Sequence, residues 1–298
     1  MEDWKGQPEM DGNVPITYHS TFGNRLIRPY GIAIDESSNI YVAEAASGRI
    51  TKFNENGEQL LRFGRGEGKI FRKIGKLNRP TGIAVDRQGN SYVADFMQNR
   101  IFKYNANGSF LNTFGSPGSD DGQFNHCRST RIDEDGYLWV VDRNNHRLQK
   151  FDAMGNFRLK LGEYGREARG MGKFDRPSDM AFDNQGYIYV VDEFNNRIQK
   201  FDPQGKFVLQ FGKAGNQKGQ FSDARGIAID SNQRIFITDA YRDQVNVFTS
   251  EGQYLFSFFG PLQVGGALFR PAGIAINQQG KLYICDYQNN RIMVFTIM

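Results

Sequence analysis

The chain has 298 residues, 39% of them apolar and 23% charged, and a formal net charge of +4. This composition excludes a disordered chain, because 25 Phe and 13 Tyr are far more aromatic residues than disordered segments carry. No apolar stretch reaches the roughly 18 residues of a membrane span, and two cysteines make no disulfide framework, so we expect a cytoplasmic protein without membrane contact.

In chain order, the polar residues 1–15 are predicted to be a flexible extension, and residues 16–23 (ITYHSTFG) a lone strand. One unit then recurs six times, from RPYGIAID at 28–35 to RPAGIAIN at 270–277. An acidic residue closes the second apolar run of every unit, at intervals of 47 to 51 residues. These six residues are Glu44, Asp95, Asp142, Asp192, Asp239 and Asp286.

Each unit contains four short runs rich in Ile, Val, Tyr and Phe, separated by Gly, Asn and Asp turns. This pattern predicts four antiparallel strands, a to d, joined by tight hairpins. A single sheet of this kind cannot bury both faces, so six sheets arranged radially are expected. The last unit ends after strand c (RIMVFTIM), and the lone strand 16–23 is predicted to complete it. The predicted fold is all-β, a single six-bladed β-propeller spanning 16–298.

The order RPxGIAID, YVxD, NNRIxKF and GxFxxxFG resembles the NHL repeat, and its six copies resemble an NHL-type six-bladed β-propeller. The resemblance implies that the face bearing the d-to-a and b-to-c loops binds a partner, since similar domains include RNA binders and protein binders. Propellers of similar architecture also include amidating lyases and lactonases that hold Zn²⁺ or Ca²⁺ in the channel.

The connection from blade 1 to blade 2, residues 62–79, is strongly basic and contains a single acid, Glu67. Aromatic side chains in the b-to-c loops lie on the same predicted face, and basic groups mixed with exposed aromatics suit single-stranded RNA as well as protein partners. A solvated charged surface is the alternative. The predicted partner-binding residues are Arg62, Arg65, Lys69, Arg72, Lys73, Lys76, Phe96, Phe194, Tyr241 and Tyr287.

The third copy departs most from the repeat, because it reads FNHCRSTRID at 124–133 where other copies carry glycine and apolar residues. Strand a is predicted to line the channel. The guanidiniums of Arg128 and Arg131 would then face a cavity in which they could hold a small carboxylate or phosphate. The alternative is that Arg131 pairs with a neighbouring acid. The predicted channel residues are Tyr30, His126, Arg128, Arg131, Asp179 and Arg225.

Arginines that recur in nearly every blade are predicted to serve the scaffold. Those that open strand c are expected to pair with the strand b carboxylates between blades, because an unpaired buried charge is costly. This set is Arg49, Arg100, Arg147, Arg197 and Arg291.

A catalytic zinc needs about three protein ligands, and of the three histidines only His126 is predicted near the axis. We therefore predict no metal, no cofactor and no catalytic residue. The predicted function is a monomeric, non-enzymatic binding module for a protein, with a single-stranded RNA binder as the first alternative. A propeller enzyme of the lyase or lactonase type is the second.

Overall fold

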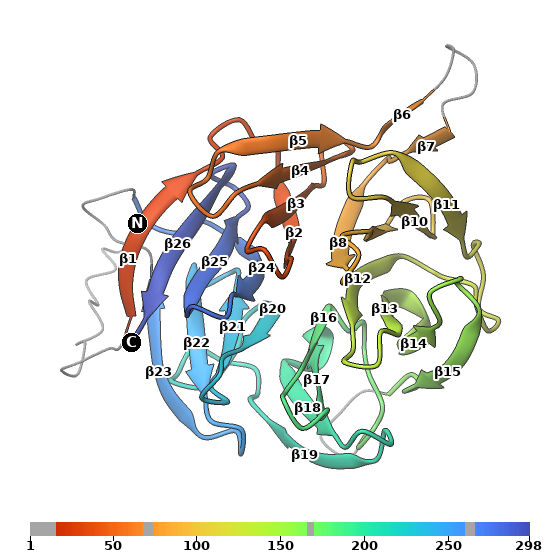
Figure 1. The fold of residues 1–298 in the computed structure, drawn as a ribbon. Helices are drawn as coiled ribbons and strands as arrows, with labels where there is room; N and C mark the ends of the chain where they lie inside the picture. Colours follow the sequence, from red (N-terminus) through yellow and green to blue (C-terminus); the bar gives the residue numbers. More distant parts are fainter. Residues whose placement is uncertain (1–15, 68–73, 166–169, 260–265) are drawn as a thin grey trace, which may run out of the picture.

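The computed structural model describes residues 16–67, 74–165, 170–259 and 266–298. In these ranges the chain forms six four-stranded antiparallel sheets, arranged as a ring of blades (Figure 1). The innermost strands, one from each blade, surround a central channel. At the end that carries the a-to-b turns, the channel has a volume of about 420 Å³. The predicted six-bladed propeller is confirmed, whereas the prediction for residues 1–15 lies outside the described residues.

The first three blades each run from an inner strand a to an outer strand d. Blade 1 is β2 (Pro29–Ile34), β3 (Ile40–Glu44), β4 (Arg49–Phe53) and β5 (Gln59–Phe63). Blade 2 is β8 (Pro80–Val85), β9 (Ser91–Asp95), β10 (Arg100–Tyr104) and β11 (Phe110–Phe114). Blade 3 is β12 (Cys127–Ile132), β13 (Leu138–Asp142), β14 (Arg147–Phe151) and β15 (Phe157–Leu161), with a 3₁₀ turn η1 (Arg143–Asn145) after β13.

The last three blades repeat this order, and blade 6 takes its outer strand from the start of the chain. Blade 4 is β16 (Asp179–Phe182), β17 (Ile188–Asp192), β18 (Arg197–Phe201) and β19 (Phe207–Phe211), with η2 (Glu193–Asn195) after β17. Blade 5 is β20 (Ala224–Ile229), β21 (Ile235–Asp239), β22 (Gln244–Phe248) and β23 (Tyr254–Phe259). Blade 6 is β24 (Pro271–Ile276), β25 (Lys281–Asp286), β26 (Arg291–Ile297) and β1 (Ile16–Phe22).

Strand b of each blade is almost completely buried, because a neighbouring blade covers each of its faces. These strands consequently read as continuous apolar runs and not as alternating ones. The core is divided into clusters that each join two adjacent blades; one of them packs Ile40 and Val42 of blade 1 against Tyr283 and Val294 of blade 6. The apolar faces that a single sheet would expose are therefore buried between blades.

The ring closes through β1, as the sequence predicts. β1 pairs antiparallel with β26 from Ile16 opposite Ile297 to Phe22 opposite Ile292. Phe22 also reaches blade 1, where its ring lies 5.0 Å from that of Phe53. β1 thus ties the last blade to the first.

The inner strands approach one another closely where strand a carries glycine. A Cβ atom added to Gly31 would lie 2.4 Å from the carbonyl oxygen of Thr81, and one added to Gly273 would lie 2.4 Å from that of Tyr30. Blades 3 and 4 carry Ser129 and Asp179 at this position. Polar side chains therefore enter the inner ring where these two blades meet.

The connection between blades 1 and 2 forms a hairpin of its own, β6 (Arg65–Glu67) and β7 (Ile74–Lys76), which projects from the ring (Figure 1). Three of the predicted partner-binding residues, Lys69, Arg72 and Lys73, lie outside the described residues. No helix in the described ranges is long and apolar enough to cross a membrane.

Candidate functional site

Five charged side chains and a tyrosine meet at the end of the channel that carries the b-to-c and d-to-a loops. They come from four blades, and each follows or begins a buried strand that fixes its position. They are Tyr30 (β2), Arg128 (β12), Arg143 (η1), Glu193 (η2), and Asp223 with Arg225 at the start of β20. We call this set the channel-mouth cluster.

Arg128 is the centre of the cluster. Its guanidinium donates to the hydroxyl of Tyr30, lies 5.0 Å from the centre of that ring, and is 3.4 Å from the Glu193 carboxylate. The second oxygen of Glu193 accepts a hydrogen bond of 3.0 Å from Arg143. Arg225 pairs with Asp223 at 2.7 Å. Blades 1, 3 and 4 are thus linked through Arg128, and Arg225 of blade 5 adds a further guanidinium.

The cluster holds more positive than negative charge and has unused donors. Three guanidiniums face two carboxylates, and the five charged side chains are only 11 to 17% exposed. The Nε atoms of Arg128 and Arg143 are buried and have no acceptor. Burial raises the pKa of Tyr30, so this residue stays a protonated donor, while burial and the Arg128 charge lower the pKa of Arg143. An anionic group would supply the missing acceptors.

Two of the predicted channel residues, Arg131 and Asp179, pair with each other. Arg131 lies 2.7 Å from Asp179, whose second oxygen accepts a hydrogen bond of 2.5 Å from Ser129. The amide of Ile227 also donates to Asp179 at 3.2 Å. The carboxylate therefore satisfies Arg131 from within the channel wall, which is the alternative that the sequence left open.

His126 lies at the rim of the mouth, in a left-handed backbone conformation with φ of 59°. Its ring stacks on Phe96 with centres 4.2 Å apart and planes 3° from parallel, and its Nδ1 is 2.6 Å from the side-chain amide of Asn144. Burial, with the nearby charges of Arg143 and Arg79, lowers the pKa of His126, so the imidazole is neutral at neutral pH. It adds no charge to the mouth.

The other predicted aromatics form a ring of arginine–aromatic stacks around the mouth. In each stack an arginine that precedes strand a lies over the aromatic of a b-to-c loop, with 4.7 to 5.2 Å between guanidinium carbon and ring centre. Phe194 and Tyr241 are exposed, by 46% and 67%. The four stacks are Arg28 on Tyr287, Arg79 on Phe96, Arg176 on Phe194 and Arg270 on Tyr241.

The basic residues in the described part of the blade 1 to blade 2 connection do not join the channel-mouth cluster. Arg62 makes two hydrogen bonds, of 3.0 and 2.7 Å, to the buried carboxylate of Glu44 and so serves the scaffold. Arg65 and Lys76 lie opposite each other on the projecting hairpin, where both are exposed. These two cations therefore remain free for a partner.

The arginines that open strand c pair within a blade and not between blades, which corrects the sequence-based expectation. Strands b and c place the carboxylate and the arginine directly opposite each other in blades 3, 4 and 6. The resulting ion pairs, of 2.7 to 2.9 Å, are Arg147 with Asp142, Arg197 with Asp192 and Arg291 with Asp286. Arg49 and Arg100 make no such pair.

Sequence analysis did not identify Arg143, Glu193 and Asp223. The first residue after the strand b acid is Ala45, Phe96, Ala240 or Tyr287 in the other blades, so the charged residues Arg143 and Glu193 break the repeat there. Asp223 likewise stands where the other copies have arginine or histidine. All three residues therefore depart from the repeat in the same way as Arg128, but they lie just outside strand a.

The mouth does not fit the metal ions of similar propellers. The residues that precede the strand a glycine position in the six blades include no histidine or cysteine; they are Tyr30, Thr81, Arg128, Ser178, Arg225 and Ala272. Within the described ranges, no group of three or more His, Cys, Asp or Glu side chains could hold a metal ion. The cluster is therefore suited to binding an anion through guanidiniums.

This architecture and its repeated motif define the chain as a β-propeller. The family model described as "NHL repeat" matches residues 124–151, 174–201 and 270–295, which contain strands of blades 3, 4 and 6. The chain is a six-bladed β-propeller that contains NHL repeats in blades 3, 4 and 6.

Two curated relatives resemble shorter stretches of the chain. A peptidyl-alpha-hydroxyglycine alpha-amidating lyase 2 from Drosophila melanogaster is 33% identical over 99 residues, or 32% of this chain and 23% of that protein. A peptidyl-glycine alpha-amidating monooxygenase B from Xenopus laevis is 32% identical over 123 residues, or 39% of this chain and 14% of that protein. The chain thus matches less than a quarter of the length of either relative.

Solved structures share the fold over most of the chain. A virginiamycin B lyase from Staphylococcus aureus has a TM-score of 0.63 at 15% identity, covering 95% of this chain and 100% of the other. A gluconolactonase from Xanthomonas campestris also has a TM-score of 0.63, at 16% identity, covering 92% and 87%. At these identities the likeness concerns the fold alone.

Proposed function

We propose that this propeller is a binding module that captures an acidic group of a protein partner at the channel mouth. The observation that carries this proposal is the convergence of Arg128, Arg143 and Arg225 on one mostly buried site that contains two carboxylates and two guanidinium Nε atoms without acceptors. A carboxylate bound there receives charge-assisted hydrogen bonds from planar guanidiniums, the geometry for which arginine is best suited.

The rim favours a protein over RNA. Phe96 contacts the His126 ring and the Arg79 guanidinium, and Phe194 contacts the guanidiniums of both Arg143 and Arg176. Aromatic and arginine side chains held in such stacks are residue types that dominate protein interfaces. The guanidiniums of Arg128, Arg143 and Arg225 also gather at one point, which suits a single acidic group better than an extended phosphate backbone.

A lyase is the second candidate function, because the curated relatives are named for amidating chemistry and share about a third of their residues with this chain over the matched stretches. The mouth offers a tyrosine and arginines to such a substrate but no side-chain ligands for a metal in the described ranges. We rank it below the binding module for this reason.

Selection of random peptides on the immobilised protein tests the proposal. We expect enrichment of peptides with Asp, Glu or a free C-terminal carboxylate, and at least tenfold weaker binding of the selected peptides to Arg128→Gln, since hydrogen bonds to charged groups contribute about 1.5 to 3 kcal/mol. Glu193→Gln should strengthen binding, because it removes the charge that competes with the ligand for Arg128 and Arg143. Arg158→Gln, at an exposed ion pair with Asp152 of the same blade, is the matched control.

Three outcomes would contradict this assignment. Peptides that bind Arg128→Gln as tightly as the wild type would show that the mouth is not the site. Single-stranded RNA that binds more tightly than about 10⁻⁴ M at physiological salt, with affinity falling steeply as salt rises, would favour RNA. Release of the amidated product from a peptidyl-alpha-hydroxyglycine, lost in Arg128→Gln, would favour the lyase.

A further inference from the structure

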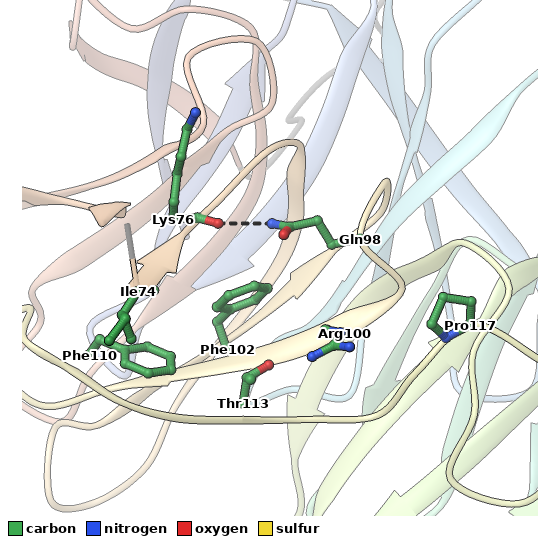
Figure 2. Close-up of a pocket in the computed structure, with 9 residues that line it drawn as sticks. Ile74, Lys76, Gln98, Arg100, Phe102, Phe110, Thr113 and Pro117 are labelled. Atoms are coloured by element: carbon green, nitrogen blue, oxygen red, sulfur yellow. Dashed lines mark hydrogen bonds between the residues drawn. The ribbon is translucent and has the colours of Figure 1, made fainter. Parts of the chain in front are cut away.

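A second cavity, of about 570 Å³, lies at the outer rim of blade 2 and away from the channel. Phe102 forms its floor, Phe110 and Ile74 lie on one side, and Arg100 lies beside Thr113 (Figure 2). The side chain of Gln98 and the backbone of Lys76 are joined across its upper edge by a hydrogen bond of 2.9 Å (Figure 2). The cavity therefore combines an apolar floor with a guanidinium.

Arg100 occupies a repeat position at which the arginines of blades 3, 4 and 6 are saturated with acceptors. Arg147 donates to Asp142, and also to the carbonyl oxygens of Asp120 and Gln123 at 2.7 and 3.1 Å. Arg197 and Arg291 bind the carboxylate of their own blade and two carbonyls of the preceding connection in the same way. These arginines are locked by one carboxylate and a backbone loop.

Blade 2 has lost these acceptors. The preceding connection forms the projecting β6–β7 hairpin (Figure 1), and none of its described carbonyls accepts a hydrogen bond from Arg100; that of Gly75 accepts one of 2.6 Å from Tyr104 of strand c. Asp95 instead accepts hydrogen bonds from the amides of Asn78 and Arg79 and from the Gln98 side chain. Arg100 is exposed, and its side chain makes no hydrogen bond or ion pair in the described part of the chain. Arg49 of blade 1 is also unpaired, but it does not line this cavity.

The residue that forms the floor of the cavity also differs between blade 2 and blades 3 and 4. Blades 3 and 4 carry Gln149 and Gln199 two residues after the arginine, and both bind the strand b carboxylate and the connection. Blade 2 has Phe102 there, 5% exposed, with its ring 6.2 Å from that of Phe110. A position that is polar and closed in blades 3 and 4 is therefore apolar and open in blade 2.

We propose that this cavity binds a small organic acid with an aromatic or branched aliphatic body. Its carboxylate takes the place of the carboxylate and carbonyls that bind the equivalent arginines of blades 3, 4 and 6, as a bidentate acceptor for Arg100, and its apolar body covers Phe102 and Phe110. The exposed Lys76 adds a second positive charge at the edge. The volume lies within the usual range of small-molecule sites, about 300 to 1,000 Å³. This site is independent of the channel mouth and of the function proposed for it.

Titration of the ¹⁵N-labelled full chain with 3-phenylpropionate tests the proposal. We expect saturable shifts of the Gln98 side-chain amide and of the backbone amides of residues 98–113. Arg100→Gln should weaken this binding at least about tenfold, Arg100→Lys should weaken it less because the charge remains, and neutral 3-phenylpropionamide should not bind. Arg100 has no partner in the described ranges, so its substitution should leave the melting temperature unchanged.

Two variants serve as controls. Arg87→Gln removes an exposed arginine of the same blade that pairs only with Glu36, at 3.6 Å, and Arg128→Gln alters the channel mouth. Neither should change the shifts at residues 98–113. The proposal is overturned if Arg100→Gln binds 3-phenylpropionate as the wild type does, if the amide binds equally well, or if no saturable shift occurs at these residues.

Discussion

Removal of β1 is expected to lower the free energy of unfolding by at least about 5 kcal/mol, which is a large part of the stability of a typical domain. The loss includes the ladder to β26 and the burial of Phe22 between the rings of Phe53 and Tyr283. Full burial of each large apolar side chain contributes about 1.5 to 3 kcal/mol, and Ile16 and Tyr18 also pack on the blade 6 core. The measurement is denaturant unfolding of a chain that starts at residue 25.

A chain that starts at residue 16 is the reference, so that the comparison reports β1 alone. Phe22→Ala in this reference should lose about 3 to 5 kcal/mol, because it opens a cavity between blades 6 and 1. The chain without β1 should also aggregate more readily, since the edge of β26 is left unpaired. Equal unfolding midpoints for the two starting points would show that β1 does not hold the ring closed.

The fold could be predicted from the sequence because the pattern that specifies a blade occurs six times in the chain. The position of β1 followed from an incomplete last unit, and the register of β1 on β26 agrees with it. The hairpin β6–β7 could not be predicted in this way, because its sequence belongs to no repeat. Its two strands pair with each other, whereas the direction in which the hairpin leaves the ring depends on its packing against the neighbouring blades.

The site was predicted in part, for a physical reason. Arg128, Arg225 and Tyr30 were found because they break the pattern of strand a, but whether an arginine is free depends on which acid lies opposite it in three dimensions. Arg131 meets Asp179 from the next blade, and Arg62 reaches Glu44 two strands away in its own blade. A local count of charges in residues 62–79 could not distinguish Arg62, which is paired, from Arg65, which is exposed.

Asp192→Ala should destabilise the protein by about 3 to 5 kcal/mol, because it removes the buried carboxylate that pairs with the buried guanidinium of Arg197. Asp192 is fully buried and accepts hydrogen bonds from Arg197 at 2.8 Å, Asn195 at 2.9 Å and Gln199 at 3.1 Å. Arg197 is itself only 3% exposed. The change is measured as the difference in unfolding free energy by denaturant titration at neutral pH.

Asp95→Ala is the matched control, since Asp95 ends the same strand in blade 2 and is equally buried but does not pair with Arg100. Its loss breaks hydrogen bonds to the amides of Asn78 and Arg79 and strands no buried arginine, so we expect a smaller destabilisation than for Asp192→Ala. Arg197→Met combined with Asp192→Ala should recover part of the loss, because the uncompensated charge is removed with its partner. If Asp95→Ala proves as costly as Asp192→Ala, the carboxylates stabilise the blades through the backbone amides alone. In that case the ion pair with arginine would add nothing to the stability of blade 4. The absence of such a pair at Arg100, on which the second site depends, would then make no energetic difference between blade 2 and blade 4.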